Sequence, residues 1–285
     1  MFVNDRGPMT NEQVKLNLHI AREPERHADS PSEDGDDQDS DVEAEREQIE
    51  RAGPAKAPHL CMHRLQKVYG HGASAKVAVR DLSVGVQMGQ CLCLLGANGA
   101  GKTSTMQILS GLVSASGGTA RVAGKSIYSS LHDIFATLGV CWQADTLWDL
   151  LTAREHLLLA CRLRAVPPPH KGVVDALLLD LRLVPWADKP VQVYSGGTRR
   201  KLCVALALVG DTTTLLLDEP STGLDPVSKR LLWSLLRRQR ARRALLLSTH
   251  SMGEAEALSS RVAILRCGRL CCLGSVQHIK SKYGR

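Results

Sequence analysis

The stretch Gly96-Ala97-Asn98-Gly99-Ala100-Gly101-Lys102-Thr103 decides how this chain folds, because it has the spacing G-x-x-x-x-G-K-T. A short apolar run, residues 91–95, precedes it, and apolar residues at helical spacing follow between 106 and 112. This order predicts a strand, a glycine-rich turn and a helix, which is the context of a phosphate-binding loop. The glycines let backbone N–H groups turn inward around a di- or triphosphate, and the helix dipole adds to that field. The alternative is a strand–helix turn that binds no ligand.

The polar residues of this loop have expected roles toward a bound nucleotide. Lys102 would reach the β- and γ-phosphates, and the hydroxyl of Thr103 would contact Mg²⁺. The stretch therefore predicts that the chain binds a nucleotide. The residues predicted to contact it are Gly96, Asn98, Gly99, Gly101, Lys102, Thr103 and Ser104.

A pair of carboxylates follows a second apolar strand, at Asp218 and Glu219. Such a strand is the usual partner of a phosphate-binding loop: Asp218 would hold Mg²⁺ through water, and Glu219 would orient or deprotonate the attacking water. The pair lies 116 residues after Lys102, on a run that predicts a core strand. The alternative is an acidic pair at the surface end of a strand.

Ser195, Gly196 and Gly197 open another predicted helix. A hydroxyl, two unencumbered N–H groups and a positive dipole end make this helix start a second candidate anion site. A site that cannot reach the loop of its own chain suggests two domains that face each other across ATP. The alternative is an ordinary capped helix.

Three single residues are weaker candidates, and each also has a structural explanation. His250 follows the buried strand 244–249, where an imidazole could sense or stabilise a γ-phosphate. Gln143, at the entry to a helical segment, could touch Mg²⁺ or the attacking water. Tyr69 could stack on adenine, although a tyrosine at a strand end is more often a packing residue.

Composition restricts the class of protein without choosing its partner. The chain has 285 residues and a net charge of +7, but residues 29–50 carry a net charge of −10, so the remainder is strongly basic. A basic body suits nucleic acid or the cytoplasmic face of a membrane. The nine cysteines are expected to be small buried residues in a reducing compartment. Because no apolar run approaches the roughly 18 residues of a membrane span, a soluble, intracellular chain is expected.

Strands that alternate with helices predict a wound α/β core. Residues 1–57 are predicted to be a disordered acidic linker, with a short charged helix over 41–50 as the alternative. The main domain is expected over 58–270, with a helical lobe at about 144–200. Residues 135–142 are predicted to be a strand that leads to Gln143. Residues 271–285 are expected to begin a C-terminal regulatory segment.

The ordered set of motifs resembles the nucleotide-binding domain of ABC transporters over roughly residues 58–285. The resemblance implies a P-loop NTPase core with an antiparallel β subdomain and an inserted helical subdomain, and it implies ATP and Mg²⁺ as cofactors. It makes Tyr69 the adenine-stacking aromatic residue, Gln143 a catalytic and metal-contacting residue, and Asp225 a carboxylate that crosses to a partner. Glu219 and His250 would be the other catalytic residues, while Thr103 and Asp218 would complete the metal site.

Finer features look like subfamily A, the lipid exporters, and specifically their second nucleotide-binding domain. The stretches that carry this similarity are 41–49, 151–156, 194–202, 248–258 and 272–280. Two departures from the general family pattern are Thr198, where an amide is common, and Tyr194, where leucine is common. Neither removes a phosphate ligand.

The resemblance implies an ATPase that powers lipid transport through ATP-dependent dimerisation. Its expected partners are a second nucleotide-binding domain, the transmembrane domains and their lipid cargo, with no nucleic acid, at the cytoplasmic face of a membrane. With one motif set and no spanning segment, the chain is expected to be a fragment, a truncated product or a subunit. The alternatives are a soluble ABC-type ATPase that acts on ribosomes or nucleic acid, and a regulatory domain without hydrolysis, which Glu219 disfavours.

Overall fold

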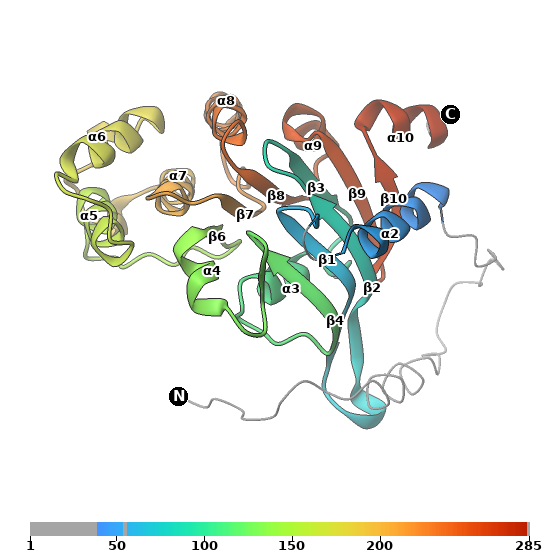
Figure 1. Ribbon diagram of the computed structural model, residues 1–285. Helices are drawn as coiled ribbons and strands as arrows, with labels where there is room; N and C mark the ends of the chain where they lie inside the picture. Colours follow the sequence, from blue (N-terminus) through green and yellow to red (C-terminus); the bar gives the residue numbers. More distant parts are fainter. Residues whose placement is uncertain (1–38, 54–55, 284–285) are drawn as a thin grey trace.

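Two β-sheets and a helical lobe make up the fold in a computed structural model that describes residues 39–53 and 56–283 (Figure 1). The larger sheet has six strands in the order β10-β9-β3-β8-β7-β6, all parallel except β10. Its strands are β3 (Cys91–Leu95), β6 (Leu138–Cys141), β7 (Thr214–Asp218), β8 (Ala244–Thr249), β9 (Arg261–Arg266) and β10 (Arg269–Gly274).

The neighbouring interior strands β7 and β8 are buried on both faces, as their leucine runs predict. Along each strand successive side chains enter different cores: Leu215 and Leu217 face one cluster, whereas Leu216 faces the other. The first cluster includes helices α7 (Gly196–Leu208), α8 (Pro226–Arg240), α9 (Met252–Leu258) and α10 (Val276–Tyr283). The second includes α3 (Lys102–Leu109), α4 (Leu131–Thr137) and the smaller sheet.

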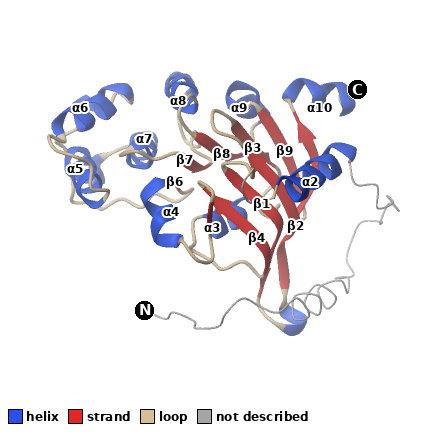
Figure 2. Cartoon of the chain, in the orientation of Figure 1, coloured by secondary structure: helices blue, strands red, loops and turns tan. Residues whose placement is uncertain are grey.

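The smaller sheet is antiparallel, in the order β2-β1-β4-β5, and its long strands run beside the larger sheet (Figure 2). Its strands are β1 (Leu60–Tyr69), β2 (Lys76–Val86), β4 (Gly117–Val122) and β5 (Lys125–Ser126).

The helical lobe lies apart from both sheets, at the left of Figure 1. It contains α5 (Ala153–Leu163) and α6 (Lys171–Asp180), and α7 returns the chain from the lobe to the sheet. A Cβ atom added at Gly139 of β6 would lie 2.0 Å from the carbonyl oxygen of Ala207, so only glycine lets α7 pack this closely. The lobe is therefore joined to the sheet next to the strand that leads to Gln143.

The predicted disordered linker is wrong for residues 40–52, which form helix α2 (Ser40–Ala52), in agreement with the alternative of a short charged helix over 41–50. Residues 1–38 lie outside the described part. Val42 and Ile49 on one face of α2 are buried. Glu45 bonds Arg261 at 2.6 Å, and Arg46 pairs with Asp81. Apolar burial and ion pairs with distant parts of the chain thus dock this highly charged helix.

Three smaller expectations also differ from the structure. The predicted strand over 135–142 is a strand only from Leu138, because Leu131–Thr137 form α4. The boundary at residue 270 falls inside β10, which pairs with β9 through Gly274. Cys267 and Cys271 are exposed rather than buried. In the described residues no helix combines the length and apolar character that a membrane span needs.

Candidate nucleotide site

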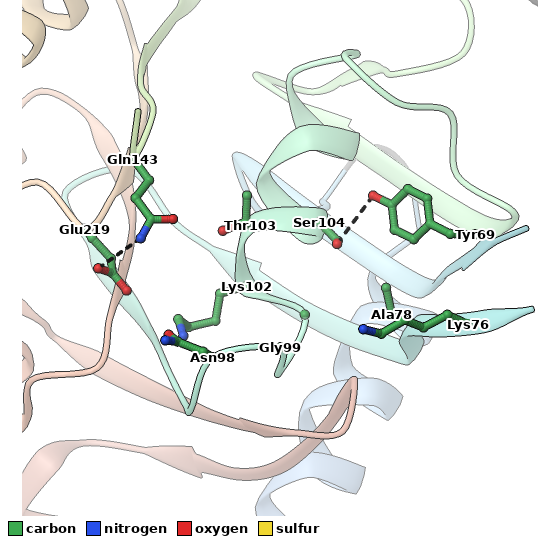
Figure 3. A pocket seen from close by; sticks show the side chains of 11 residues that line it. Tyr69, Lys76, Ala78, Asn98, Gly99, Lys102, Thr103, Ser104, Gln143 and Glu219 are labelled. Carbon is green, nitrogen blue, oxygen red and sulfur yellow. Dashed lines mark hydrogen bonds between the residues drawn. The ribbon is translucent and has the colours of Figure 1, made fainter. Parts of the chain in front are cut away.

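A cavity of about 370 Å³ opens beside the glycine-rich loop, where both sheets contribute to its wall (Figure 3). It brings together many of the residues that the sequence predicted, from the loop, from β1 and from the ends of β6 and β7. Its lining residues are Tyr69, Lys76, Ala78, Asn98, Gly99, Gly101, Lys102, Thr103, Ser104, Gln143 and Glu219.

The loop connects β3 to α3 in a backbone conformation that needs glycine. Gly101 has φ 102°, and a Cβ atom there would lie 2.4 Å from the carbonyl oxygen of Ala78. Lys102 is 5% exposed, and its ammonium donates to the carbonyl oxygens of Gly96 at 2.7 Å and Ala97 at 3.0 Å. The lysine charge is therefore held over the loop by the loop itself, at the start of α3 where an anion would also meet the positive helix end.

Thr103 and Asp218 form an oxygen-rich pair at the end of β7. The Thr103 hydroxyl donates to Oδ2 of Asp218 at 2.8 Å, and the Ser248 hydroxyl donates to the other carboxylate oxygen. Asp218 is only 1% exposed, so this buried carboxylate has both oxygens directed by neighbours. Hydroxyl and carboxylate oxygens are hard ligands of the kind that Mg²⁺ prefers, and the pair fits that ion.

Glu219 lies across the cavity from the loop, and its carboxylate has three polar neighbours. Gln143 Nε2 lies 3.5 Å from its Oε2, and the Thr222 hydroxyl donates to the same oxygen at 3.2 Å. Its Oε1 lies 3.1 Å from Nδ1 of His250. The structure thus brings Gln143, Glu219 and His250 together, and it adds Thr222, for which the sequence carried no recognisable signal.

Tyr69 stands at the other end of the cavity. Its hydroxyl donates toward Ser104 Oγ at 3.4 Å and Gln107 Oε1 at 3.3 Å, which ties the ring to α3. Lys76 and Ala78 line the same wall, although sequence reasoning did not single them out. Their position at the start of β2, opposite the end of β1, is the pairing signal that could have found them.

Ser195, Gly196, Gly197 and Asp225 do not line this cavity. Ser195 caps α7 by accepting from Thr198 N–H at 3.2 Å, and Asp225 caps α8. A hydrogen bond from the Ser228 side chain, followed by backbone N–H donors, lowers the pKa of Asp225. Ser195, Gly196 and Asp225 are exposed, so both helix starts lie open at the surface.

The two departures from the general family pattern have local structural roles. Thr198 is buried, and its hydroxyl lies 2.9 Å from that of Ser195. The Tyr194 hydroxyl donates to the Trp186 carbonyl at 2.6 Å and accepts from Ala153 N–H at 3.3 Å. Tyr194 therefore anchors the segment before α7 to the helical lobe.

The sheet order, the loop and the acidic strand end define the class of P-loop nucleotide-binding proteins. Comparison with solved structures agrees with this class. The ATP-binding subunit of an ABC transporter is similar with a TM-score of 0.72 at 26% identity, over 79% of this chain and 93% of that one. A dimeric ATP-binding cassette bound to ADP and Pi has a TM-score of 0.69 at 19% identity, over 76% and 98% of the two chains.

Comparison with protein families matches residues 79–222 to the model described as ABC transporter, and this chain belongs to that family. Among curated relatives, the retinal-specific phospholipid-transporting ATPase ABCA4 of Bos taurus is 46% identical over 250 residues, which are 87% of this chain and 11% of that protein. ATP-binding cassette sub-family A member 2 of Homo sapiens is 45% identical over 276 residues, 95% of this chain and 11% of that one. Phospholipid-transporting ATPase ABCA3 of Homo sapiens is 45% identical over 251 residues, 87% and 15% of the two chains.

The predicted fold class and the predicted relationship with subfamily A are confirmed. The chain spans only 11–15% of the length of these relatives.

Proposed function

We propose that this chain is the ATP-binding and ATP-hydrolysing domain of a subfamily A transporter, and that it powers lipid transport across a membrane. The observation that carries the proposal is the position of Glu219, which faces the phosphate-binding loop across one cavity and is flanked by Gln143 and His250. The names of two relatives, both phospholipid-transporting ATPases, support lipid as the cargo.

In the proposed complex, adenine stacks on Tyr69 and the triphosphate occupies the glycine-rich loop. Lys102 leaves its loop carbonyls to bind the β- and γ-phosphates, while Ser104 and the backbone N–H groups hold the remaining oxygens. Thr103 and Asp218 would hold Mg²⁺, with Gln143 as a further ligand, and the ion would supply positive charge to the phosphate groups.

In the hydrolytic step, Glu219 orients a water molecule and accepts a proton from it. The water oxygen forms a bond to the γ-phosphorus, and the bond from that phosphorus to the bridging oxygen of ADP breaks. His250 holds Glu219 Oε1 and contacts the γ-phosphate, while Gln143 fixes the other side of the carboxylate. These residues supply positioning and charge, which is most of what phosphoryl transfer needs from a protein.

The exposed starts of α7 and α8 would serve a second nucleotide-binding domain. Since Ser195 and Asp225 lie outside the cavity of their own chain, we place them against the ATP held by the partner. The dimeric cassette among the similar structures supports this arrangement. Closure on ATP would drive the transmembrane domains at the cytoplasmic face, with Trp148 (59% exposed) and Leu150 (80% exposed) as candidate contacts.

The substitution Glu219→Gln tests the catalytic role. It keeps the shape of the side chain but removes the proton acceptor, so kcat for ATP should fall by about 10²- to 10⁴-fold while ATP still binds. The matched control is Glu43→Gln, an exposed position of α2, which should leave kcat unchanged. Steady-state phosphate release and calorimetric ATP binding measure the two quantities. Unchanged hydrolysis in the Glu219 variant would refute the role.

The substitution Ser195→Arg tests the dimer. In a Glu219→Gln background, where ATP persists, the chain with Ser195 should form ATP-dependent dimers by size-exclusion chromatography. The arginine would fill the space of the partner's γ-phosphate, so the double variant should stay monomeric while binding ATP with unchanged affinity. Persistent dimers in the double variant would contradict the shared-site model.

A further inference from the structure

Arg200, on the second turn of α7, places its guanidinium beneath the catalytic end of the sheet. It is 4% exposed, and its contacts are backbone carbonyl oxygens of two separate segments. At the end of β6 it donates to Trp142 and, at 3.2 Å, to Gln143. At the end of β7 it donates to Asp218, to Glu219 at 2.8 Å and to Pro220 at 3.3 Å.

A buried cation of this kind is poorly explained by stability alone. Among the described residues, the nearest carboxylate is that of Asp145, whose Oδ1 lies 3.9 Å from the guanidinium. Main-chain oxygens rather than a close ion pair therefore solvate the charge. Apolar residues of similar volume often stabilise a core at least as well as buried charges do. What a guanidinium adds is a rigid, planar set of five donors that can hold two chain segments at a fixed separation, which the single ammonium of lysine cannot do.

One of the held segments has a conformation that needs support. Glu219 has φ 48°, in the left-handed region that a residue with a side chain rarely adopts. Its N–H donates to the carbonyl and to the hydroxyl oxygen of Ser248, both at 3.1 Å, and its own carbonyl accepts from Arg200. Ser248 and Arg200 therefore hold the N–H and the carbonyl of a residue with a strained backbone, whose side chain lines the cavity.

We propose that Arg200 is a positioning residue for ATP hydrolysis. It fixes the backbones of Gln143 and Glu219 relative to each other, so that both side chains meet where the attacking water would lie. It also connects these two residues to α7, whose N-cap residue is Ser195. The inference rests on the proposed hydrolytic role of Glu219 and adds the residue that sets the geometry of that role.

Arg200→Lys tests the proposal in the full 285-residue chain, with Arg243→Lys as its control. Arg243 has the same chemistry at the opposite end of β7, where it donates to the carbonyls of Thr212 at 2.8 Å, Leu208 at 3.3 Å and Gly210 at 3.4 Å. Because a misplacement of about 1 Å can lower a rate by about 10²-fold, we expect kcat of the Arg200 variant to fall about 10- to 100-fold. Its Kd for ATP should stay within about threefold, since neither segment carries the loop, whereas Arg243→Lys should lose stability but keep kcat.

Arg200→Gln is the second variant, because a neutral amide removes the buried charge and endangers folding less. It should show the same selective loss of kcat. Normal kcat in either Arg200 variant, or equal losses of kcat in the Arg200 and Arg243 variants, would overturn the proposal. Unfolding of both Arg200 variants while Arg243→Lys folds would also overturn it, since Arg200 would then be a stabilising residue. Glu219→Gln, assayed in parallel, separates the two ideas: if it keeps full activity, the proposed function itself fails.

Discussion

Helix α2 should be part of the folded domain, and removing its two buried side chains should weaken the whole molecule. Val42 is 6% exposed and Ile49 is 9% exposed, seven residues apart on one face of the helix. Replacing a buried isoleucine by alanine costs about 2–5 kcal/mol. Val42→Ala removes two methyl groups, at about 0.8 kcal/mol per buried carbon.

The double variant Val42→Ala, Ile49→Ala should therefore lose about 4–7 kcal/mol of unfolding free energy, unless α2 detaches first and the loss stops at its docking energy. For a typical m-value of about 1–3 kcal/mol per molar urea, the midpoint should move down by about 1 M or more. Urea unfolding followed by circular dichroism measures this shift.

The matched control changes Glu43 and Gln48 to alanine, since both are exposed on the same helix. Alanine is the best helix former, so this control should unfold within about 0.5 kcal/mol of wild type. If the Val42 and Ile49 variant also unfolds at the wild-type midpoint, α2 contributes nothing to the domain and the packing argument fails.

Two further outcomes are expected. Tyr69→Ala should raise the Kd for ATP about 5- to 150-fold, because it removes one base–aromatic stacking contact of about 1–3 kcal/mol. Tyr69→Phe keeps the ring and should bind ATP nearly as wild type does. Calorimetry measures both affinities. Burial raises the pKa of Asp39, but hydrogen bonds from Lys282 and Tyr283 outweigh that effect and lower it to about 2. Because the folded pKa lies below the unfolded value, this carboxylate stabilises the fold fully above about pH 4 and stops doing so as the pH falls through 2. Asp39→Asn should thus have a lower melting temperature than wild type at pH 6, and this difference should disappear near pH 2. A difference in melting temperature that stays constant over this pH range would refute the prediction.

The parts of the fold that the sequence predicted are those in which local pattern and packing agree. The loop before Lys102 and the acidic end of β7 were found because each combines a recognisable motif with an apolar run typical of a buried strand. The sequence offered helix α2 only as the alternative to a disordered linker, because its charged composition resembles a solvated segment. Arg261 and Asp81, which pair with Glu45 and Arg46 of the helix, are remote in sequence, and only the folded chain brings them together.

The candidate site shows the same division between local and tertiary signals. Gln143 and Glu219 follow recognisable strands, whereas Lys76 and Thr222 carry no motif and join the site only through strand pairing and a turn. The exposure of Cys267 could not be anticipated either, since it depends on the tight turn between β9 and β10 rather than on composition.

The buried polar residues around β7 and β8 follow a single physical requirement. A strand of this sheet needs only apolar side chains to be stable, yet Ser248 is completely buried beside Asp218. The Ser248 hydroxyl donates to the Asp218 carboxylate and accepts the N–H of Glu219, so one small side chain serves both acidic residues. Arg200 then donates to the carbonyl oxygens of both acidic residues. Each buried polar group of this strand end that lost its partner would cost about 1–3 kcal/mol. Ser248 and Arg200 supply those partners to Asp218 and Glu219. Ser248 and Arg200 are therefore best understood as the support of the two acidic residues, of which Glu219 lines the cavity and Asp218 lies buried behind it.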